Sequence, residues 1–268
     1  MSLINLSNDF AIIKISGMDS LKFLQGQITN DILLLDTQDY IFASNLNIKG
    51  RILVNFIIYK NNEDYFLFLN SELVDMIILK LKMYIFRSKV FINRESLFIY
   101  FSDVSQNNLD GMNHNIQLFP NAFLCMSNKE MQDYNSDLKS WKLFLIKNKI
   151  PFIYKVNQEK FIPQHISMDQ LNAISFKKGC YIGQEIVARI QYLGSIKRRL
   201  FSFRINTKVN IGDEVFSPLM NNQEVGTVVE VVYHNDLETE GLLSIQIGCI
   251  QEAFYDKDNQ FRFNITSE

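Results

Sequence analysis

A cysteine beside two lysines is the residue of this sequence best placed for nucleophilic chemistry. Cys180 follows Lys177, Lys178 and Gly179 and lies just ahead of an apolar repeat at helical spacing. Cations and the positive end of a helix dipole both favour the thiolate, which is the reactive form of cysteine. The alternative is a small buried side chain, which free cysteines usually are. The pattern therefore predicts either a functional thiol or a structural one.

A strand end, a turn and a helix are predicted to position Cys180. Residues 174–176 are expected to end a strand, and the helix is expected to begin after Gly183. Its apolar face is formed by four residues: Ile186, Val187, Ile190 and Leu193. Gly194 is expected to end the helix in a left-handed conformation. Glu185 and Arg189 stand four residues apart in the order that favours a surface ion pair, which is one interpretation of both.

Three further residues could bind a ligand by their type. Trp141, the single tryptophan, shares a helical face with Leu138 and Leu145, so spacing alone favours a place in the core. Lys49 and Arg51 flank Gly50 in a predicted turn. Two cations around a glycine suit a carboxylate ligand, but they are also common in solvated turns.

Length and composition indicate an ordinary soluble globular protein. The chain is 47% hydrophobic and 21% charged, and its 268 residues are enough for one large domain or two to three smaller ones. The net charge of −2 gives no general attraction to nucleic acid or to an anionic membrane. No apolar run is long enough to span a bilayer, and the N-terminus lacks a secretory signal. We therefore expect a cytoplasmic protein that binds neither nucleic acid directly nor membranes.

The cysteines and histidines argue against several kinds of site. Cys125, Cys180 and Cys249 are widely separated and form no Cys-x-x-Cys pair, so neither a zinc ribbon nor a redox dithiol is expected. One copy of the chain cannot supply four thiolates to an iron–sulfur cluster. The three histidines form no ligand motif, so we expect no metal site.

The first two-thirds of the chain are predicted to mix strands and helices. Strands are expected at residues 10–16, in a meander over 40–69, and near 89–92, 97–101 and 116–126. Helices are expected after Asp19, from a Ser71 cap to about Met83, and over 137–148. Residues 105–115 are expected to form a loop without chemistry.

The last quarter of the chain is predicted to be all β. Short β-runs lie at residues 200–205, 214–216, 225–233, 242–247 and 261–265, with turns at 212–213 and 221–222. This spacing predicts a small antiparallel barrel. The fold class is therefore α+β, with a body over residues 1–195 and a C-terminal β-barrel over 196–268.

One long segment around Cys180 resembles the signature of a known family. Residues 178–185 (Lys-Gly-Cys-Tyr-Ile-Gly-Gln-Glu), continuing to Arg189, resemble the YgfZ-type folate-binding proteins, which are relatives of the glycine-cleavage T-protein, an aminomethyltransferase. The resemblance extends to four other segments: 23–31, 47–51, 161–164 and 192–199. It covers most of the chain and is weakest between about residues 103 and 136.

The resemblance implies a fold, a cofactor and a set of site residues. The fold is an aminomethyltransferase-like, folate-binding body with a terminal barrel, and the cofactor is tetrahydrofolate or a derivative. The motif thiol is Cys180. The residues that the resemblance assigns to folate, aromatic rings first, are Phe10, Trp141, Lys49, Arg51, Lys178, Gln184, Glu185 and Arg189. At Phe10 we expect tryptophan in the family, so the π-face is kept and the indole donor is lost. Gln184 and Glu185 are alternatively ordinary residues of a first helical turn.

Two departures from the family pattern bear on activity. Aminomethyltransferases carry an acidic pair in the strand where this chain has Val54 and Asn55, so the carboxylate used in transfer is absent. Ser167 stands where the family usually has asparagine, which puts one polar contact in question.

Three hypotheses of function follow. The first is a folate-binding accessory protein that uses its motif cysteine to support iron–sulfur enzymes, including those that thiolate tRNA. The second is an active folate-dependent aminomethyl or one-carbon transferase, which the residues Val54 and Asn55 disfavour. The third is a binding scaffold with a structural cysteine. The first is the one we prefer, and it predicts that the classical aminomethyltransferase activity is lost.

Overall fold

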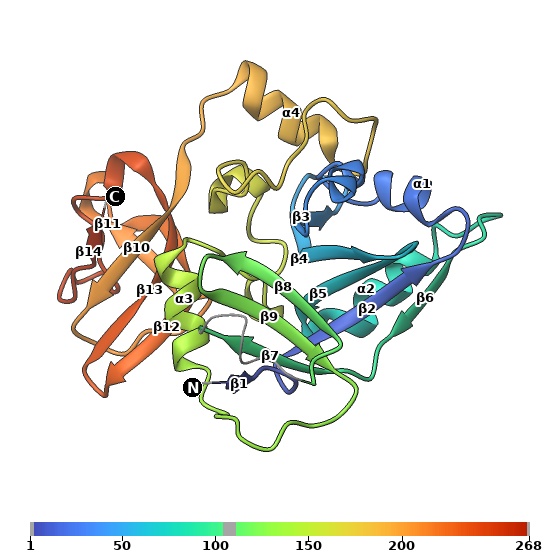
Figure 1. The fold of residues 1–268 in the computed structure, drawn as a ribbon. Coiled ribbons are helices and arrows are strands. Elements are labelled where there is room, and N and C mark those ends of the chain that lie inside the picture. Colours follow the sequence, from blue (N-terminus) through green and yellow to red (C-terminus); the bar gives the residue numbers. More distant parts are fainter. Residues whose placement is uncertain (1–2, 104–110, 267–268) are drawn as a thin grey trace. The chain divides into compact units, whose positions relative to one another are not determined.

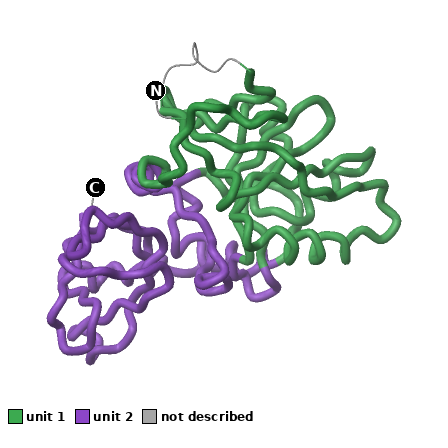
Figure 2. The backbone as a smooth tube through the Cα atoms, turned by 90° about the horizontal axis from the view of Figure 1, so that it is seen from below, with its two compact units in different colours: residues 1–46, 53–141, 172–182 green, residues 47–52, 142–171, 183–268 purple. Residues whose placement is uncertain are grey.

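The structure is a computed structural model that describes residues 3–103 and 111–266. It divides into two compact units (Figure 2). Unit 1 comprises residues 1–46, 53–141 and 172–182, and unit 2 comprises residues 47–52, 142–171 and 183–268. Each unit is thus assembled from segments that are distant in the sequence. Of the predicted loop over residues 105–115, residues 105–110 lie outside the described residues, and the last two residues, His114 and Asn115, belong to a strand instead.

The first sheet of unit 1 is antiparallel and has the strand order β3-β4-β5-β2-β6 (Figure 1). Its strands are β2 (Phe10–Ser16), β3 (Ile41–Leu46), β4 (Ile52–Asn61), β5 (Asp64–Asn70) and β6 (Phe91–Arg94). The predicted strand over 10–16 and the predicted meander are confirmed. β3, β4 and β5 are buried almost throughout, because their apolar residues are nearly continuous rather than alternating.

The second sheet of unit 1 has the strand order β1-β7-β9-β8. Its strands are β1 (Leu3–Asn5), β7 (Phe98–Ser102), β8 (His114–Phe119) and β9 (Ala122–Ser127). The prediction of one strand over 116–126 is wrong, because the chain turns at Pro120 and forms an antiparallel hairpin. Proline has no N–H for a ladder, so it interrupts this apolar run.

The helices of unit 1 lie where the sequence predicts them, but one cap differs. α1 spans Ser20–Gln25, and α2 spans Val74–Lys82 after a 3₁₀ turn, η2 (Ser71–Leu73). The side chain of Asn70, not that of Ser71, caps η2 by accepting from the Glu72 N–H at 3.1 Å. The predicted Ser71 cap is therefore wrong, since an asparagine at the strand end reaches the N–H two residues on. α3 (Lys139–Lys147), whose residues 142–147 belong to unit 2, confirms the next predicted helix.

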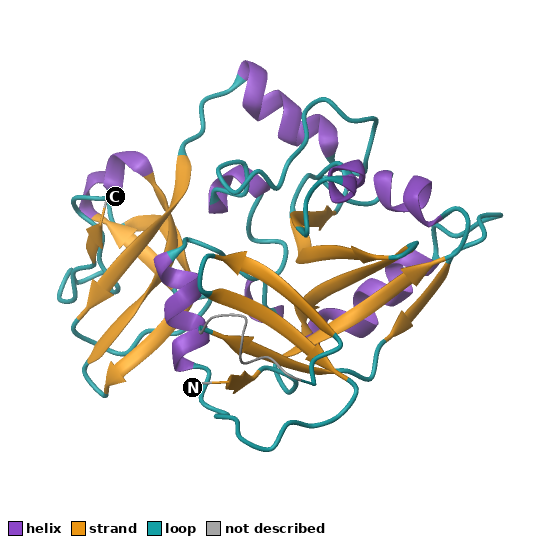
Figure 3. Ribbon diagram, viewed as in Figure 1, coloured by secondary structure: helices purple, strands orange, loops and turns teal. Residues whose placement is uncertain are grey.

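The C-terminal part of unit 2 is one antiparallel sheet with the strand order β11-β12-β13-β10-β14 (Figure 3). Its strands are β10 (Arg198–Ile205), β11 (Glu214–Ser217), β12 (Gln223–Asn235), β13 (Glu238–Gln246) and β14 (Asn264–Thr266). All five predicted strands are present, but the predicted closed barrel is not confirmed. Between β11 and the segment before β14, the described residues form only isolated bridges, from Phe216 to Phe254 and from Phe254 to Arg262.

The remainder of unit 2 carries the helix of the cysteine motif. α4 spans Gln184–Leu193 and begins after Gly183, as predicted. Gly194 is extended, with φ −108° and ψ 174°, so the predicted left-handed helix end is wrong. Of the four apolar residues on the predicted face, only Val187 is buried, and Leu193 is 85% exposed.

The predicted strand end before the cysteine is also wrong. Residues 174–176 lie outside every described strand, although Ile174 is buried. The Ser175 N–H donates to the Thr29 carbonyl at 3.0 Å, which is a single main-chain bond rather than a ladder. The β-branched side chain of Ile174 is buried there without forming part of a ladder.

The architecture as a whole mixes helices with several antiparallel sheets, as the sequence predicts. Across residues 3–103 and 111–266, no helix is long and apolar enough to cross a membrane. The domain boundary that the sequence predicts at 195/196 falls between α4 and β10, and it stays a prediction.

Candidate functional sites

The two aromatic residues assigned to folate lie together in unit 1, inside a cluster of rings. The Phe10 ring stacks on Phe68 with centroids 4.8 Å apart, and its edge meets Trp141 at 5.8 Å. Trp141 also contacts Phe68 at 6.1 Å and Phe101 at 5.1 Å. The exposed fraction of Phe10 is 2% and that of Trp141 is 0%. The structure therefore brings the two residues together, and it packs their rings against protein.

Lys178 is held against two backbone carbonyls of unit 1. Its Nζ donates to the Ile28 carbonyl at 2.9 Å and to the Asn30 carbonyl at 2.6 Å. Burial lowers the pKa of Lys178 to about 8, and the nearby Asp31 carboxylate opposes this shift. The ammonium also lies 5.3 Å from the centre of the Tyr181 ring. Lys178 thus connects the cysteine motif to the family-like segment 23–31.

The three cysteines differ sharply in exposure. Cys180 is exposed, whereas Cys125 and Cys249 are buried. Burial raises the pKa of the Cys125 thiol to about 12, so that residue is unreactive near neutral pH. Cys180 is therefore the free thiol of this chain that a reagent or a partner can reach, which fits the functional interpretation better than the structural one.

The turn that carries Lys49 and Arg51 belongs to unit 2 and is built around Asn47 and Gly50. The Asn47 side-chain oxygen accepts from the N–H groups of Lys49 at 2.9 Å and Arg51 at 3.0 Å. Gly50 has a φ of +70°, and a Cβ there would lie 2.8 Å from the Ile186 Cβ. Glycine is therefore required both by the left-handed conformation and by the close approach of α4.

Three family-like segments meet in unit 2. Gly50 packs on the first turn of α4, and the Gln164 side chain donates to the Val187 carbonyl in α4 at 2.8 Å. The Ile52 N–H donates to the Phe161 carbonyl at 2.8 Å. The segments 47–51, 161–164 and 184–189 are thus parts of one packed frame, although more than 100 residues separate the first from the second.

The polar residues of α4 assigned to folate are largely solvent-facing. Glu185 and Arg189 are exposed, and Gln184 is partly buried. Within the described part of the chain, no ion pair joins Glu185 to Arg189. The interpretation of Arg189 as the partner of Glu185 is therefore wrong. Exposure leaves the Glu185 and Arg189 side chains open to a ligand or a partner, and a role of all three residues in binding stays a prediction.

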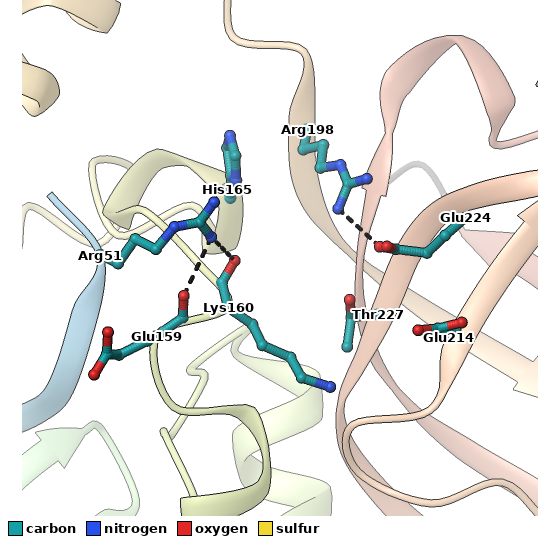
Figure 4. Close-up of a pocket in the computed structure, with 8 residues that line it drawn as sticks. All are labelled: Arg51, Glu159, Lys160, His165, Arg198, Glu214, Glu224 and Thr227. Carbon is teal, nitrogen blue, oxygen red and sulfur yellow. Dashed lines mark hydrogen bonds and ion pairs between the residues drawn. The ribbon is translucent and has the colours of Figure 1, made fainter. Parts of the chain in front are cut away.

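A polar pocket of about 460 Å³ lies entirely within unit 2 (Figure 4). Its lining residues come from the 47–52 turn, the 159–165 segment and the C-terminal sheet: Arg51, Glu159, Lys160, His165, Arg198, Glu214, Glu224 and Thr227. The Arg51 guanidinium is oriented by the carbonyls of Glu159, at 3.2 Å, and Lys160, at 2.7 Å. The pocket thus contains one of the cations that the resemblance assigned to folate.

The other lining residues of this pocket were not predicted from the sequence. Arg198 lies in the family-like segment 192–199, which was the one signal that could have indicated it. His165 follows the segment 161–164 directly, but as a single histidine it matched no ligand motif. Lys160, Glu214 and Thr227 carry no pattern at all, because only folding places them beside Arg51.

The histidine of the pocket is held in its neutral form. Burial lowers the pKa of His165 to about 4, and the positive charges of Arg198 and Arg51 lower it further. Arg198 is itself paired with Glu224 at 3.2 Å. At neutral pH His165 can therefore exchange hydrogen bonds with a ligand without adding positive charge.

The positions that depart from the family pattern are both buried. Val54 and Asn55 lie in β4 and are 0% and 3% exposed. Ser167 has a φ of +55°, and its hydroxyl accepts from the Leu200 N–H at 3.1 Å. Asparagine adopts such a conformation more readily than serine, which gives a backbone reason for the family preference. Among residues 3–103 and 111–266, no three His, Cys, Asp or Glu side chains gather as a metal site.

The candidate residues therefore fall into two sets. Unit 1 holds Phe10, Trp141, Lys178 and Cys180, and unit 2 holds Lys49, Arg51, Gln184, Glu185 and Arg189. The first set is mainly apolar and closed, apart from the exposed thiol. The second set is polar and open.

The chain is similar in sequence to known proteins over most of its length. No protein-family model matches the chain. An uncharacterized protein of Haemophilus influenzae is 29% identical over 259 residues, which cover 94% of this chain and 90% of the relative. A protein of Aliivibrio fischeri named tRNA-modifying protein YgfZ is 29% identical over 95% of this chain and 86% of its own length. One of the same name from Pectobacterium atrosepticum is 28% identical over 91% and 87%.

Among solved structures, glycine cleavage system aminomethyltransferase T from Bartonella henselae matches with a TM-score of 0.68 at 11% identity. The match covers 98% of this chain and 83% of that one. The fold is therefore aminomethyltransferase-like, and the resemblance to YgfZ-type proteins is confirmed.

Proposed function

We propose, from the resemblance to proteins named tRNA-modifying protein YgfZ, that this chain is a folate-binding accessory protein. It binds tetrahydrofolate or a derivative and supports the assembly or repair of iron–sulfur enzymes in the cytoplasm, including enzymes that modify tRNA. The observation that carries the proposal is similarity to these relatives over 91–95% of the chain. The aminomethyltransferase-like fold supports it independently of sequence identity.

Only some of the residues that the resemblance assigns to folate are open to a ligand in this structure. Arg51 lines an open polar pocket, and Lys49 is exposed beside it, so both suit the carboxylates of the glutamate tail. Phe10 and Trp141 are buried among other rings, so neither presents an open face to a pterin. The proposal of folate binding is therefore supported by the resemblance and by the cations rather than by the aromatic pair.

Cys180 is the proposed functional thiol. It is exposed and sits four residues before α4, in the segment that carries the resemblance. The described residues offer no cluster of metal ligands around it. Because the thiol is exposed in the segment that carries the resemblance, we assign it a role in contact with client enzymes.

The second candidate function is an active aminomethyl or one-carbon transferase. The fold favours it, since the structural relative is an aminomethyltransferase. The chemistry disfavours it, because Val54 and Asn55 offer no carboxylate and are enclosed in β4. Formation of methylenetetrahydrofolate from an aminomethyl donor above a no-protein control would favour this alternative.

The domain organisation of the proposed protein is a body over residues 1–195 and a barrel over residues 196–268. The isolated bridges at Phe254 support a barrel-like closure, because they link the β11 side of the C-terminal sheet to the segment before β14.

A titration with tetrahydrofolate tests the central claim. We expect saturable heat by calorimetry, and a change in the fluorescence of Trp141, the single tryptophan. Trp141→Phe should weaken binding if the ring contacts the ligand. Saturating tetrahydrofolate without any calorimetric or spectral response contradicts the proposed function.

A complementation experiment tests the thiol. Cys180→Ser is nearly isosteric but has no accessible anion at neutral pH, so it should keep the fold and lose support of iron–sulfur enzymes. The readout is the activity of such enzymes in a strain that lacks the gene, with the wild-type chain as the positive control. Full complementation by Cys180→Ser would restrict the function to folate binding.

A further inference from the structure

One stretch of unit 1, from the middle of α2 to the end of β6, is strongly basic, and we call residues 76–94 the basic segment. It contains no aspartate or glutamate and five cations: Lys80, Lys82, Arg87, Lys89 and Arg94. The whole chain has a net charge of −2, so the residues outside this segment carry −7 (−2 minus 5). Positive charge is therefore concentrated in one part of a weakly acidic protein, and that part attracts acidic groups although the net charge does not.

The exposed cations of the basic segment are not neutralised by the protein. In the described ranges 3–103 and 111–266, no ion pair is formed by the four exposed ones: Lys82, Arg87, Lys89 and Arg94. The Arg87 guanidinium lies 5.7 Å from the centre of the Phe86 ring, which is a contact with a ring and not with an acid. A carboxylate of a partner would therefore gain charge-assisted hydrogen bonds at these residues.

Five large apolar side chains of the same segment are exposed. They are Leu79, Met83, Tyr84, Phe86 and Phe91, and their exposed fractions run from 43% for Tyr84 to 89% for Phe86. Leu79 and Met83 stand four residues apart, so they share one face at the end of α2. Methionine, aromatic residues and arginine are enriched at protein–protein interfaces, and a partner that covers such side chains removes apolar surface from water.

The strand β6 lies at the edge of its sheet, beside β2 (Figure 1). The Glu95 N–H donates to the Ile12 carbonyl at 2.9 Å, and it continues the register of this antiparallel pair. Residues of such a pair alternate between bonding to the neighbouring strand and facing away from it. Asn93 therefore bonds to β2, whereas the main-chain groups of Ile92 and Arg94 face outward. Among the described strands, none pairs with this outer side.

Charge, apolar surface and main-chain groups together favour a polypeptide as the partner. Pairing with a second copy would bring two basic segments together, and these repel each other. A lipid surface would have to bury the outward N–H and C=O groups of Ile92 and Arg94 without partners. A single-stranded RNA could stack bases on the exposed rings, but the aliphatic Leu79 and Met83 give it no such platform. An acidic polypeptide in an extended conformation complements all three features.

We propose that the basic segment is a docking surface for an acidic, extended segment of a partner protein, which adds to the β6 edge as a further strand. Its main chain exchanges hydrogen bonds with Ile92 and Arg94, as in strand addition generally. Its carboxylates meet the exposed cations, and its apolar side chains cover Phe86 and Phe91. The inference does not rest on the proposed function, because it uses neither folate nor Cys180, and it stands even if tetrahydrofolate does not bind.

Hydrogen exchange of single amides, measured by NMR, is the first arm of the test. The probe is the capped peptide Glu-Val-Glu-Phe-Glu-Val, and the control probe carries lysine in place of each glutamate. In the free protein the amides of Ile92 and Arg94 should exchange rapidly and that of Asn93 slowly, because only Asn93 of these three bonds to β2. The acidic peptide at saturation should slow exchange at Ile92 and Arg94 at least about tenfold, whereas the lysine peptide should not.

Two other probes test the alternative partners. They are oligouridylate, for single-stranded RNA, and vesicles of phosphatidylserine and phosphatidylcholine, for an anionic lipid surface. Neither should slow exchange at Ile92 and Arg94, since neither supplies a strand. If either one binds the basic segment while the acidic peptide does not, the proposal is overturned and the surface belongs to that class of partner.

Two substitutions of Arg94 separate the main chain from the charge. Arg94→Gln removes the cation and keeps the outward N–H, so it should weaken binding of the acidic peptide about threefold. Arg94→Pro also removes that N–H without removing a bond to β2, which is the setting in which an edge strand accepts proline. It should weaken binding at least about tenfold. Thermal unfolding of both variants checks that the fold is kept.

An exposed ring supplies a second pair of variants, which carries the test if Arg94→Pro does not fold. Phe86→Ser should weaken binding of the acidic peptide about fivefold, because it removes apolar surface that the partner covers. Leu237→Ser is the matched control, since Leu237 is also exposed but lies in unit 2, between β12 and β13. Unchanged exchange at Ile92 and Arg94 with the acidic peptide, equal affinity of the two folded Arg94 variants, or equal affinity of the two serine variants overturns the proposal.

Discussion

The aromatic cluster of unit 1 and the polar pocket of unit 2 both contain residues assigned to folate, yet their surroundings differ. In the cluster, Trp141 and Phe10 touch other rings and expose 0% and 2% of their surface. In the pocket, Arg51 and Arg198 border an open space of about 460 Å³. The same resemblance therefore covers one region that is stabilised by the packing of rings and another whose polar groups face an open space.

Lys178 and Arg51 show the same difference between an enclosed and an open environment. Lys178 in unit 1 and Arg51 in unit 2 each donate to two backbone carbonyls. Burial lowers the pKa of Lys178 to about 8, whereas Arg51 is exposed and has further N–H donors on its guanidinium. The same hydrogen-bond pattern thus encloses the Lys178 ammonium but leaves other N–H groups of Arg51 open to solvent.

Removing the ring of Trp141 should have the largest effect on stability. Trp141→Ala is expected to lower the free energy of unfolding by about 4 kcal/mol, because it leaves a large cavity among Phe10, Phe68 and Phe101. Phe86→Ala is the control, since that ring is 89% exposed and should cost no more than about 0.5 kcal/mol. Urea denaturation measures both. A loss below about 1 kcal/mol for Trp141→Ala would show that the cluster is not packed as described.

Labelling with a thiol reagent should distinguish the exposed Cys180 from the buried Cys125. A maleimide at neutral pH should modify Cys180 faster than Cys125 by on the order of a hundredfold, since Cys125 reacts only when the structure opens. Mass spectrometry of peptides after timed quenching measures the rates. Denatured protein, in which all three thiols should react alike, is the control. Comparable rates in the folded chain would contradict the burial of Cys125.

The pocket histidine should make stability depend on pH. The pKa of His165 is lowered from its ordinary value of 6.5 to about 4, so the unfolded chain binds more protons between these values. The free energy of unfolding should therefore rise as the pH increases from about 4 to 6.5. His165→Gln should remove a part of this dependence on the order of 2 kcal/mol. Parallel pH profiles for wild type and variant would contradict a partly buried, neutral His165.

The smallest effect is expected at the turn that supports the pocket. Gly50→Ala places a Cβ 2.8 Å from the Ile186 Cβ at a φ of +70°, and it should cost about 1–2 kcal/mol. Gly179→Ala is the matched control, because a Cβ there meets nothing within 4 Å. Thermal unfolding measures both variants. If the two substitutions cost the same, α4 does not pack on the turn as the structure indicates.

Local pattern was enough to predict much of the secondary structure. The apolar runs of β2, β4 and β5 and the helical repeat of α4 were predicted within a few residues, because period and flanking turns are local properties. The predictions that failed also concern local alternatives, such as the hairpin at Pro120 and the cap at Asn70. The Asn70 cap is a local bond one residue before the predicted cap, and the hairpin turn lies inside an apolar run, so the run alone indicated neither.

The cysteine motif and its lysine were likewise evident in the sequence, since their order alone carries the resemblance. The exposure of Cys180 could not be predicted from the sequence, because burial depends on which residues the rest of the fold covers. Trp141 was equally consistent with core and with ligand wall until Phe10, Phe68 and Phe101 were seen around it. The sequence could name this residue but could not decide its surroundings.

The polar sites were decided by the tertiary structure. Glu230 interrupts an apolar strand and is 0% exposed, yet its carboxylate accepts from Tyr154 and pairs with Lys142 at 3.3 Å. The pocket likewise gathers Arg51, Lys160 and Arg198 from positions up to 147 residues apart in the sequence (198 minus 51). Sequence determines which residues are charged, but pairing, burial and pKa depend on distances across the fold, and only packing sets those distances.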